Sequence, residues 1–408
     1  MDTKDLDRSK NSSHKESKRI LYILPQPFFS LRGSSFRAKA TLQALVALGF
    51  IVDLICFDMG ENVAMTGVTL FRLGSFNFIK QISIGPSFSK LFLDCFLFRA
   101  ANRLVAKNSY SAIHGVEEGG FIAHFLAKKY KIPFIFDMHS CMSEYIKNTK
   151  FKYIPFLGRI FQFFERKSFY EAAGVITVGQ DHAALVASIY KDVLIHTLHD
   201  LPLPIAYDQK AVVKLKSDLK LEGYKTCVYT GNFESYQGIE LLLIAWKKLI
   251  AKNKTFKLIL VGGTPAQVKS YLKMSEKIGI GKNIIFVGNQ PQEEVGNYLM
   301  LADILVSPRS SGANTPLKIY GYMTCGKPIV ATNIRSHTQV LSEKEAYLAA
   351  ANPEALAQAM AAALSDEPTE QALKNSRIKA AQELAQKYFN PQEFENVLRN
   401  AYEFSLSC

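Results

Sequence analysis

Residues 19–25 read RILYILP, residues 36–49 read FRAKATLQALVALG and residues 50–58 read FIVDLICFD. The first and last runs are short, apolar and rich in branched residues, as in buried strands, whereas the middle run has the length of a helix and ends at a glycine. A strand, a helix and a strand in this order predict a right-handed crossover between parallel strands. The stretch 19–58 therefore predicts the start of a parallel α/β sheet.

The alternation of strands and helices continues along the chain with one interruption. It runs through apolar strands at 111–116, 133–140 and 174–179, and pauses across DLPLPIAYD at 200–208, whose two prolines favour a linker. A second series begins at 226–233. The pattern predicts an α/β fold with two doubly wound, parallel-sheet, Rossmann-like domains that face each other across a cleft, because such sheets bind ligands beyond the carboxyl ends of their strands.

The length of 408 residues also suits two domains. We expect a disordered polar tail at 1–18, an N-terminal domain at 19–202, a C-terminal domain at 209–385 and a final helix at 386–408 that packs back toward the N-terminal domain. The tail has no apolar segment of the kind that a secretion signal needs. The most apolar later stretch, 88–105, carries four charged residues and is not a membrane-spanning candidate.

The composition is basic, with 49 Lys and Arg against 36 Asp and Glu and a formal charge of +13. This excess suits an anionic small substrate or an anionic membrane surface, and no nucleic-acid recognition motif accompanies it. The six cysteines show neither paired spacing nor a zinc pattern, so we expect no metal site and a reduced compartment. The predicted location is the cytoplasm, with peripheral attachment to a membrane as an extension of that prediction.

Two stretches carry the chemistry of a phosphate site. In PQPFFSLRGSS, residues 25–35, Gly33 and Ser34 place free backbone N–H groups at a helix N-terminus, although a plain turn remains an alternative. In residues 310–332 the pair Thr315-Pro316 predicts a helix start with a hydroxyl cap. The N–H groups of Leu317 and Lys318, with the Lys318 ammonium, would then hold a diphosphate; the alternative is a capped helix with a solvated lysine.

The run TPLKIYGYMTCGKPIVAT, residues 315–332, resembles the donor-binding helix of the retaining glycosyltransferases of family 4, in which P-x-K-x-x-E-x-M-A-x-G-x-P-V-V-A-T is a usual form. YTGNFESYQGIELLLIAW, residues 229–246, is similar to the strand, glycine turn and helix of that family. The resemblance covers about residues 19–365 and implies a GT-B fold. It also implies transfer of a sugar from a nucleotide-sugar donor with retention of configuration and without a required metal, the first domain binding the acceptor and the second the donor.

The resemblance implies a set of site residues. His139 resembles the histidine near the reacting carbon of the donor sugar, Gly33 the glycine that faces the diphosphate, and Gly231 the glycine turn beside the phosphates. The predicted catalytic residues are His139, Lys318 and Arg309. The predicted donor-binding residues are Gly33, Ser34, Gly231, Asn232, Asn289, Asn314, Thr315, Pro316 and Leu317. The acceptor-side candidates are His114, Glu117 and Glu144.

The sequence also departs from the family pattern. Ala313 and Gly321 stand where two glutamates normally lie, and Asn232 and Gln237 stand where a basic pair is usual. The nearest replacements for the missing positive charge are Arg309 and Lys318, followed by Arg37 and Arg335. These departures allow two interpretations, an active divergent subgroup, which we favour, and a catalytically silent protein.

The histidines have alternatives as well. His139 and His114 follow apolar runs, where ligands bind in such sheets, but either can be a satisfied structural residue. His337 faces the same cleft if the strand at 328–333 is placed correctly.

Residues 147–170, KNTKFKYIPFLGRIFQFFERKSFY, combine six basic side chains with eight aromatic ones. This composition favours contact with an anionic bilayer, helped by Lys80, Lys90, Arg99 and Arg103; the alternative is a helix that buries its aromatic residues.

Together these observations predict a glycosyltransferase that acts on a glycan or lipid-linked acceptor of the cell envelope. The alternatives are a silent nucleotide- or glycan-binding scaffold and a sugar-nucleotide epimerase.

Overall fold

The computed structural model describes residues 18–30, 33–74, 88–140, 156–251, 253–312 and 314–407. Ala313, Glu144, Lys80 and the residues 147–155 of the basic, aromatic segment lie outside these ranges. The chain divides into two compact units, the first made of Met1–Thr177, Leu185–His196 and Glu395–Cys408 and the second of Val178–Ala184 and Thr197–Phe394. Residues 178–184 thus belong to the second unit, whereas the sequence placed them in the first domain.

The first unit is built on a seven-stranded sheet with the order β3-β2-β1-β4-β5-β6-β7. Its strands are β1 (Arg19–Pro27), β2 (Ile51–Phe57), β3 (Val68–Arg72), β4 (Ala112–Val116), β5 (Phe134–Met138), β6 (Gly174–Thr177) and β7 (Ile195–Thr197). The pairs from β3 through β6 are parallel, with Tyr22 of β1 opposite His114 of β4. The chain order therefore reverses between β1 and β4, where ligands of such sheets bind.

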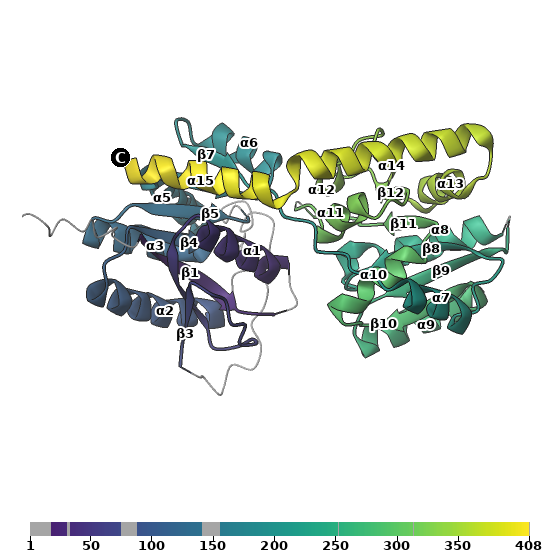
Figure 1. Cartoon of the computed structure of the whole chain (residues 1–408), viewed down its shortest axis with the longest axis horizontal. Helices are drawn as coiled ribbons and strands as arrows, with labels where there is room; N and C mark the ends of the chain where they lie inside the picture. Colours follow the sequence, from purple (N-terminus) through teal and green to yellow (C-terminus); the bar gives the residue numbers. More distant parts are fainter. Residues whose placement is uncertain are drawn as a thin grey trace, which may run out of the picture. The chain divides into compact units, whose positions relative to one another are not determined.

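Helices cover this sheet (Figure 1). They are α1 (Gly33–Ala47), α2 (Phe88–Lys107), α3 (Glu118–Tyr130) and α5 (Leu157–Glu171). Two further helices, α6 (Gln180–Ile189) and α15 (Pro391–Ser407, yellow at the C-terminus), begin with residues of the second unit and end with residues of the first. Leu97 of α2, Leu126 of α3 and Phe169 of α5 join Leu21 and Phe136 of the sheet in one buried cluster. This apolar layer holds the strands, and so their carboxyl ends, in fixed positions.

The second unit repeats the plan with six parallel strands in the order β10-β9-β8-β11-β12-β13. These are β8 (Lys225–Thr230), β9 (Phe256–Val261), β10 (Ile284–Gly288), β11 (Ile304–Ser307), β12 (Ile329–Thr332) and β13 (Tyr347–Ala349). The helices are α7 (Gln209–Asp218), α8 (Ile239–Ile250), α9 (Pro265–Lys277), α10 (Gln292–Met300), α11 (Leu317–Thr324), α12 (Arg335–Thr338), α13 (Pro353–Leu364) and α14 (Pro368–Tyr388). Here the order reverses between β8 and β11.

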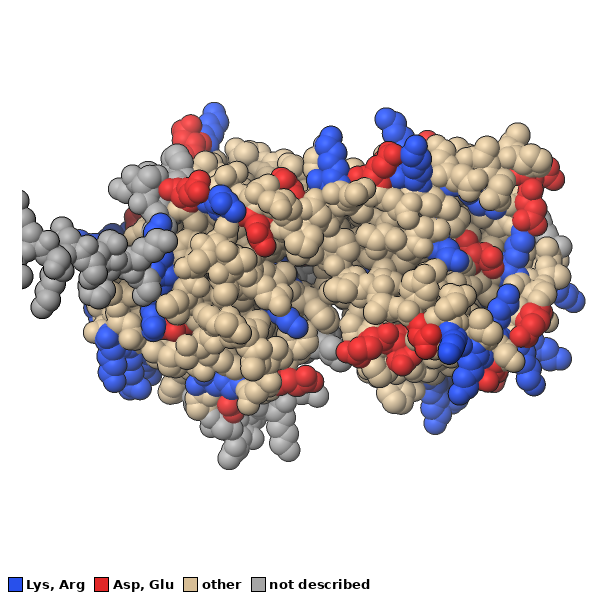
Figure 2. Space-filling model, viewed as in Figure 1, with Lys and Arg blue, Asp and Glu red and all other residues tan. Residues whose placement is uncertain are grey.

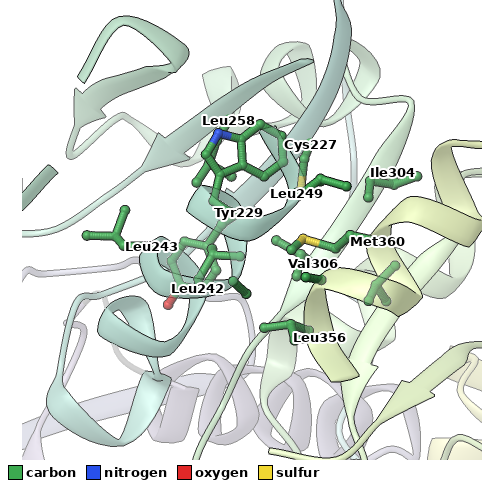
Figure 3. Close-up of a cluster of buried hydrophobic side chains, with 14 of the residues drawn as sticks. Cys227, Tyr229, Leu242, Leu243, Leu249, Leu258, Ile304, Val306, Leu356 and Met360 are labelled. Carbon is green, nitrogen blue, oxygen red and sulfur yellow. The ribbon is translucent and has the colours of Figure 1, made fainter. Parts of the chain in front are cut away.

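The main core of the second unit lies between its sheet and two helices. Figure 3 shows Leu242 and Leu249 of α8 and Met360 of α13 gathered against Cys227 and Ile304 of the strands. The single tryptophan, Trp246, is fully buried in the same cluster. Helix α8 presents these residues on one face because its apolar positions recur at helical spacing. The packing fixes the turns that join β8 to α8 and β11 to α11.

Candidate functional site

The glycine turn after β8 brings backbone close to a lysine of α11. Gly231 has a φ of +136°, and a Cβ placed on it would lie 2.8 Å from Nζ of Lys318. Further along the turn, Gly238 has a φ of +74°, and a Cβ there would lie 2.0 Å from the carbonyl oxygen of Pro308. The positive φ favours glycine at both positions, and at Gly238 the backbone carbonyl also leaves no space for a Cβ. They let the segments after β8 and β11 meet at one edge of the sheet.

The Lys318 ammonium is held by neutral groups. Its Nζ lies 3.7 Å from the centre of the Tyr229 ring and donates a hydrogen bond of 3.3 Å to Oε1 of Gln237. Burial, and then the nearby Arg309 guanidinium, hold the pKa of Lys318 well below its usual range. An aromatic ring and an amide oxygen attract a cation but carry no net charge to offset it.

Arg309, which follows β11, is held in the same way. Its Nε donates to the carbonyl oxygen of Ser311 at 2.8 Å and its Nη1 to that of Asn314 at 2.8 Å. The guanidinium also lies over the Tyr236 ring, 5.0 Å from its centre. Burial lowers the pKa of Arg309. These bonds fix the loop that leads into α11.

In the described part of the chain, no acidic side chain pairs with Lys318 or Arg309. The two other candidates for the missing charge behave differently, since Arg37 pairs with Asp137 at 3.4 Å and Arg335 with Asp181 at 2.5 Å. The structure thus leaves the first two cations without a counter-charge. Such an arrangement favours an anion.

The start of α11 differs from the expected one. Pro316, not Thr315, occupies the N-cap position, and no side chain caps the helix. The reason is the extended conformation of Pro316, whose ψ of 133° starts the helix one residue later. The first backbone hydrogen bond runs from Ile319 N–H to the Pro316 carbonyl at 2.9 Å, so the N–H groups of Leu317 and Lys318 precede it. These two N–H groups still point where an anion is favoured.

The remaining donor candidates are spread over several strand ends. Asn232 is exposed beside Gly231, and its carbonyl accepts a 2.7 Å hydrogen bond from the Tyr229 hydroxyl. Asn289 is also exposed but follows β10, two strands away from β8. Gly33 and Ser34 belong to the first unit, where they begin α1. The structure therefore gathers the residues around Gly231, Arg309 and Lys318 and does not place Asn289 among them.

In the first unit a buried carboxylate organises the corresponding edge. Asp137, on β5, contacts Nη2 of Arg37 and Nε2 of both His114 and His139, each at 3.4 Å. Burial alone would raise the pKa of Asp137, but Arg37 and the two histidines hold it well below its usual range. The Nε–H of Arg37 also donates to Nε2 of His139 at 3.1 Å, a bond that only neutral His139 can accept. Burial opposes protonation of His139, yet Asp137 outweighs it and raises the pKa of His139.

Glu117 lies beside this cluster, at the turn between β4 and α3. The Ser140 hydroxyl donates to its carboxylate, 3.2 Å from both oxygens. Burial raises the pKa of Glu117 to about 7, against the lowering effect of His139. Its carboxyl group therefore changes protonation near neutral pH, as a group that exchanges a proton with a substrate hydroxyl does.

Two histidines need correction. His114 is fully buried in the middle of β4, stacked on Tyr22 with ring centres 4.4 Å apart, so it cannot face an acceptor as expected. His337 is also fully buried, and its ring nitrogens bond Ser307 and Thr332. Both imidazoles are buried and have hydrogen-bond partners within the protein, so neither is directed toward a ligand at the edge of its sheet.

Sequence reasoning missed Asp137, Tyr229, Tyr236 and Tyr402. Asp137 had a signal, since it is an acidic residue inside an apolar strand. The tyrosines had none, because only the folded chain brings their rings or hydroxyls to charged partners.

Two Rossmann-like units in tandem, the second with a helix start that favours an anion, define a class of protein with the GT-B fold. Residues 32–193 match the family model described as Glycosyl transferase 4-like domain, and residues 214–380 match the model Glycosyl transferases group 1. The two matched segments together cover most of the chain, with one glycosyltransferase model in each half of it.

Curated and solved relatives agree with this class. D-inositol 3-phosphate glycosyltransferase of Corynebacterium diphtheriae is 24% identical over 154 residues, which is 36% of this chain and 36% of that protein. Sucrose-phosphate synthase from Thermosynechococcus elongatus has a TM-score of 0.73 at 18% identity, over 95% of this chain and 98% of that one. Anabaena HepE, solved in complex with UDP, has a TM-score of 0.70 at 14% identity, over 95% and 99%. WaaG, a glycosyltransferase involved in lipopolysaccharide biosynthesis, has a TM-score of 0.69 at 14% identity, over 95% and 99%.

Proposed function

We propose that the protein is a retaining glycosyltransferase that moves a sugar from a nucleotide-sugar donor to a glycan or lipid-linked acceptor. The observation that carries the donor part is the pair of cations, Lys318 and Arg309, held by neutral partners beside the first N–H groups of α11. A diphosphate supplies the negative charge that this edge lacks. The same groups stabilise the charge that develops on the diphosphate as the sugar leaves.

Binding of a diphosphate changes the protonation of Lys318. Its pKa lies well below the usual range because burial and Arg309 disfavour the charged form. An anion beside it reverses that balance and raises the pKa. Binding is therefore coupled to uptake of a proton wherever free Lys318 is neutral, and affinity falls as the pH rises through its pKa.

Calorimetric titration tests the donor site. UDP is the first probe because HepE was solved with it, followed by GDP and ADP. The heat of binding, compared in Tris and in HEPES buffers, reports the proton uptake. Lys318→Met should weaken binding about 10- to 100-fold and abolish the uptake, since a hydrogen bond to a charged group contributes about 1.5–3 kcal/mol. Lys225→Met is the matched control, because Lys225 begins β8 at the opposite edge and pairs with Asp366.

The first unit supplies the acceptor side of the proposal. His139 lies next to the donor sugar by resemblance to the family, and Glu117, with its pKa of about 7, lies beside it as the group that orients or deprotonates an acceptor hydroxyl. Retention follows from front-face attack, as in family 4, and requires no metal. Nuclear magnetic resonance of the product anomer tests retention. Full activity after treatment with a chelator tests metal independence, and its loss would refute it.

The acceptor is proposed to be an envelope glycan or its lipid carrier, reached at the inner face of the membrane. Helix α5 exposes Phe156, at its N-cap, and Ile160, Phe163 and Phe164, which share one helical stripe. Arg159 and Arg166 lie beside exposed rings, with Arg159 6.0 Å from the centre of Phe156. An apolar stripe with flanking cations suits an anionic bilayer surface.

Other residues of the expected membrane face are already engaged. Phe169 is buried in the core and Lys90 pairs with Glu118 at 2.7 Å. The described helices include none that is long and apolar enough to cross a membrane. Figure 2 shows both charge signs over the face that it draws, so the proposal rests on α5 and not on the overall charge.

Sedimentation with vesicles tests this part. The protein should pellet with vesicles rich in phosphatidylglycerol at low salt and not with phosphatidylcholine alone. Phe163→Ser should reduce pelleting severalfold, whereas Val213→Ser, at a similarly exposed site on α7, should not. Equal pelleting of the two variants would refute the membrane surface.

A catalytically silent, nucleotide-binding scaffold is the second candidate, because Gly321 and Gln237 stand where charged contacts are usual in the family. Donor binding without release of nucleoside diphosphate, for all acceptors tried, would favour it. Conversion of the sugar nucleotide without transfer would instead indicate an epimerase.

A further inference from the structure

A buried chain of side chains joins the C-terminal helix to the charged cluster of the first unit. The Tyr402 hydroxyl, on α15, lies 2.8 Å from Nδ1 of His114. Nε2 of the same imidazole lies 3.4 Å from Oδ2 of Asp137. All three residues are essentially inaccessible to solvent, and they come from α15, β4 and β5.

The direction of each hydrogen bond follows from the protonation states. Asp137 is a carboxylate and only accepts, so Nε2 of His114 carries a hydrogen and donates to it. Burial lowers the pKa of His114, which leaves the ring neutral and its Nδ1 without a hydrogen. Nδ1 therefore accepts from Tyr402, whose phenol keeps its proton because burial raises its pKa. In the described residues Tyr402 has no hydrogen-bond partner other than His114.

We propose that Tyr402 is a positioning residue for His139. By donating to Nδ1 it adds to the effect of burial and favours neutral His114, with its one proton aimed at Asp137, so that the negative charge of Asp137 remains available to Arg37 and to the protonation of His139. The C-terminal helix thus influences the protonation of His139 through His114. As an effect on catalysis, this inference rests on the proposed transferase function.

The charged and titratable groups around both histidines come from every neighbouring element. His139 is influenced by Arg37 of α1, Asp137 of β5 and Glu117 before α3. His114 is flanked by Tyr22 and Tyr402, and is influenced by Asp137, Arg37 and His139. The two imidazoles share one carboxylate, so a proton gained by one disfavours protonation of the other.

The test is the variant Tyr402→Phe, which keeps the ring and removes only the hydroxyl. Nuclear magnetic resonance of the full chain, labelled at histidine with ¹³C and ¹⁵N, reports tautomers and titration midpoints. Wild-type His114 should remain neutral with its hydrogen on Nε2 between about pH 5.5 and 8.5. The variant removes the hydrogen bond that favours neutral His114, so more of His114 should be protonated at the acidic end of this range. The midpoint of His139 should then fall by about one unit, because a like charge lies nearby more often.

Tyr110→Phe is the matched control. The Tyr110 hydroxyl is another buried donor of this unit, but it bonds the carboxylate of Asp53, at 2.6 Å, and none of its hydrogen bonds among the described residues reaches Asp137. This variant should leave both histidines unchanged. The variant His114→Gln has no imidazole at position 114 whose tautomer could change. Adding Tyr402→Phe to it should therefore leave the titration midpoint of His139 at the value measured for His114→Gln alone.

The inference is overturned if wild-type His114 carries its hydrogen on Nδ1, or if Tyr402→Phe leaves the His139 midpoint unchanged. A kinetic experiment measures the rate of sugar transfer as a function of pH. The midpoint that reports His139 should shift by the same amount as in the resonance measurement, while KM stays constant. If no donor is bound or turned over, the proposed function fails, whereas the resonance measurement still decides the inference. The two failures are therefore distinguishable.

Discussion

The carboxyl edges of the two sheets are built on the same topology and treat positive charge in opposite ways. In the first unit, Arg37 and its partner Asp137 are almost fully buried, with 2% and 0% of their side chains exposed. In the second unit, Lys318 and Arg309 are held by aromatic rings, an amide and backbone carbonyls. One edge is electrically satisfied by the chain itself, whereas at the other no carboxylate among the described residues pairs with the two cations.

Burial of a cation therefore has different consequences for stability and ligand binding, depending on whether a carboxylate lies beside it. A buried ion pair is a fixed part of the structure, and removal of one partner is costly because the other charge remains. In the free protein, burial disfavours the charged form of a cation that has no carboxylate beside it. A bound anion stabilises that charged form. The comparison can be broken or sharpened by measuring stability and binding in each unit.

The largest expected effect is that of Asp137→Asn. It leaves Arg37 buried without its counter-charge and should destabilise the first unit by about 3–5 kcal/mol. Hydrogen exchange of peptides from β4 and β5 measures the loss. The exposed pair between Asp181 and Arg335 provides the control, since Asp181→Asn should cost less than about 1 kcal/mol. Equal effects would show that the buried pair does not hold the edge.

The next effect is a loss of stability of the second unit in acid. His337 has its pKa lowered from 6.5 to about 4, chiefly by burial, so the unfolded chain binds a proton that the folded one does not. Stability is therefore lost as the pH falls from about 6.5 to 4, by about 3 kcal/mol in total. Urea unfolding followed by the fluorescence of Trp246 reports this unit. A flat profile across that window would contradict the prediction.

The first unit should contain a transition of opposite sign. Glu117 has its pKa raised from 4.5 to about 7 by burial, so the folded chain holds a proton that the unfolded one has lost. Stability falls as the pH rises from about 4.5 to 7, and Glu117→Gln should recover on the order of 2 kcal/mol at pH 8. Hydrogen exchange of α3 peptides at pH 5 and pH 8 measures it; a gain at pH 5 as large as at pH 8 would count against titration of Glu117.

The smallest effect concerns Lys318→Met without ligand. Removing an uncompensated buried charge should leave the second unit unchanged or stabilise it by about 1 kcal/mol, even though the same variant should bind diphosphate more weakly. Trp246 fluorescence in urea measures the change. A clear destabilisation would mean that Lys318 is a structural residue and would remove the contrast with Arg37.

Much of the fold could be predicted from the sequence. Buried parallel strands leave continuous apolar runs, which located β1, β2, β4, β5, β6 and β8 to β12, whereas the three-residue strands β7 and β13 were not predicted. Strand β3 and helix α2 were not predicted, because VTLFR is short and 88–105 mixes apolar with charged residues. Gly231 was predicted from the resemblance to family 4, Lys318 from the helix start at Thr315-Pro316, and Arg309 as a replacement for the missing positive charge.

The sequence by itself determined the two α/β series, the glycine turns and the basic helix start, because each depends on neighbours within a few residues. Only the tertiary structure decided which positive charges are compensated. Arg37 lies 100 residues from Asp137, and His114 lies 288 residues from Tyr402. Pairing over such separations depends on how strands and helices pack, since a side chain finds its partner only when the sheet has brought their backbones together.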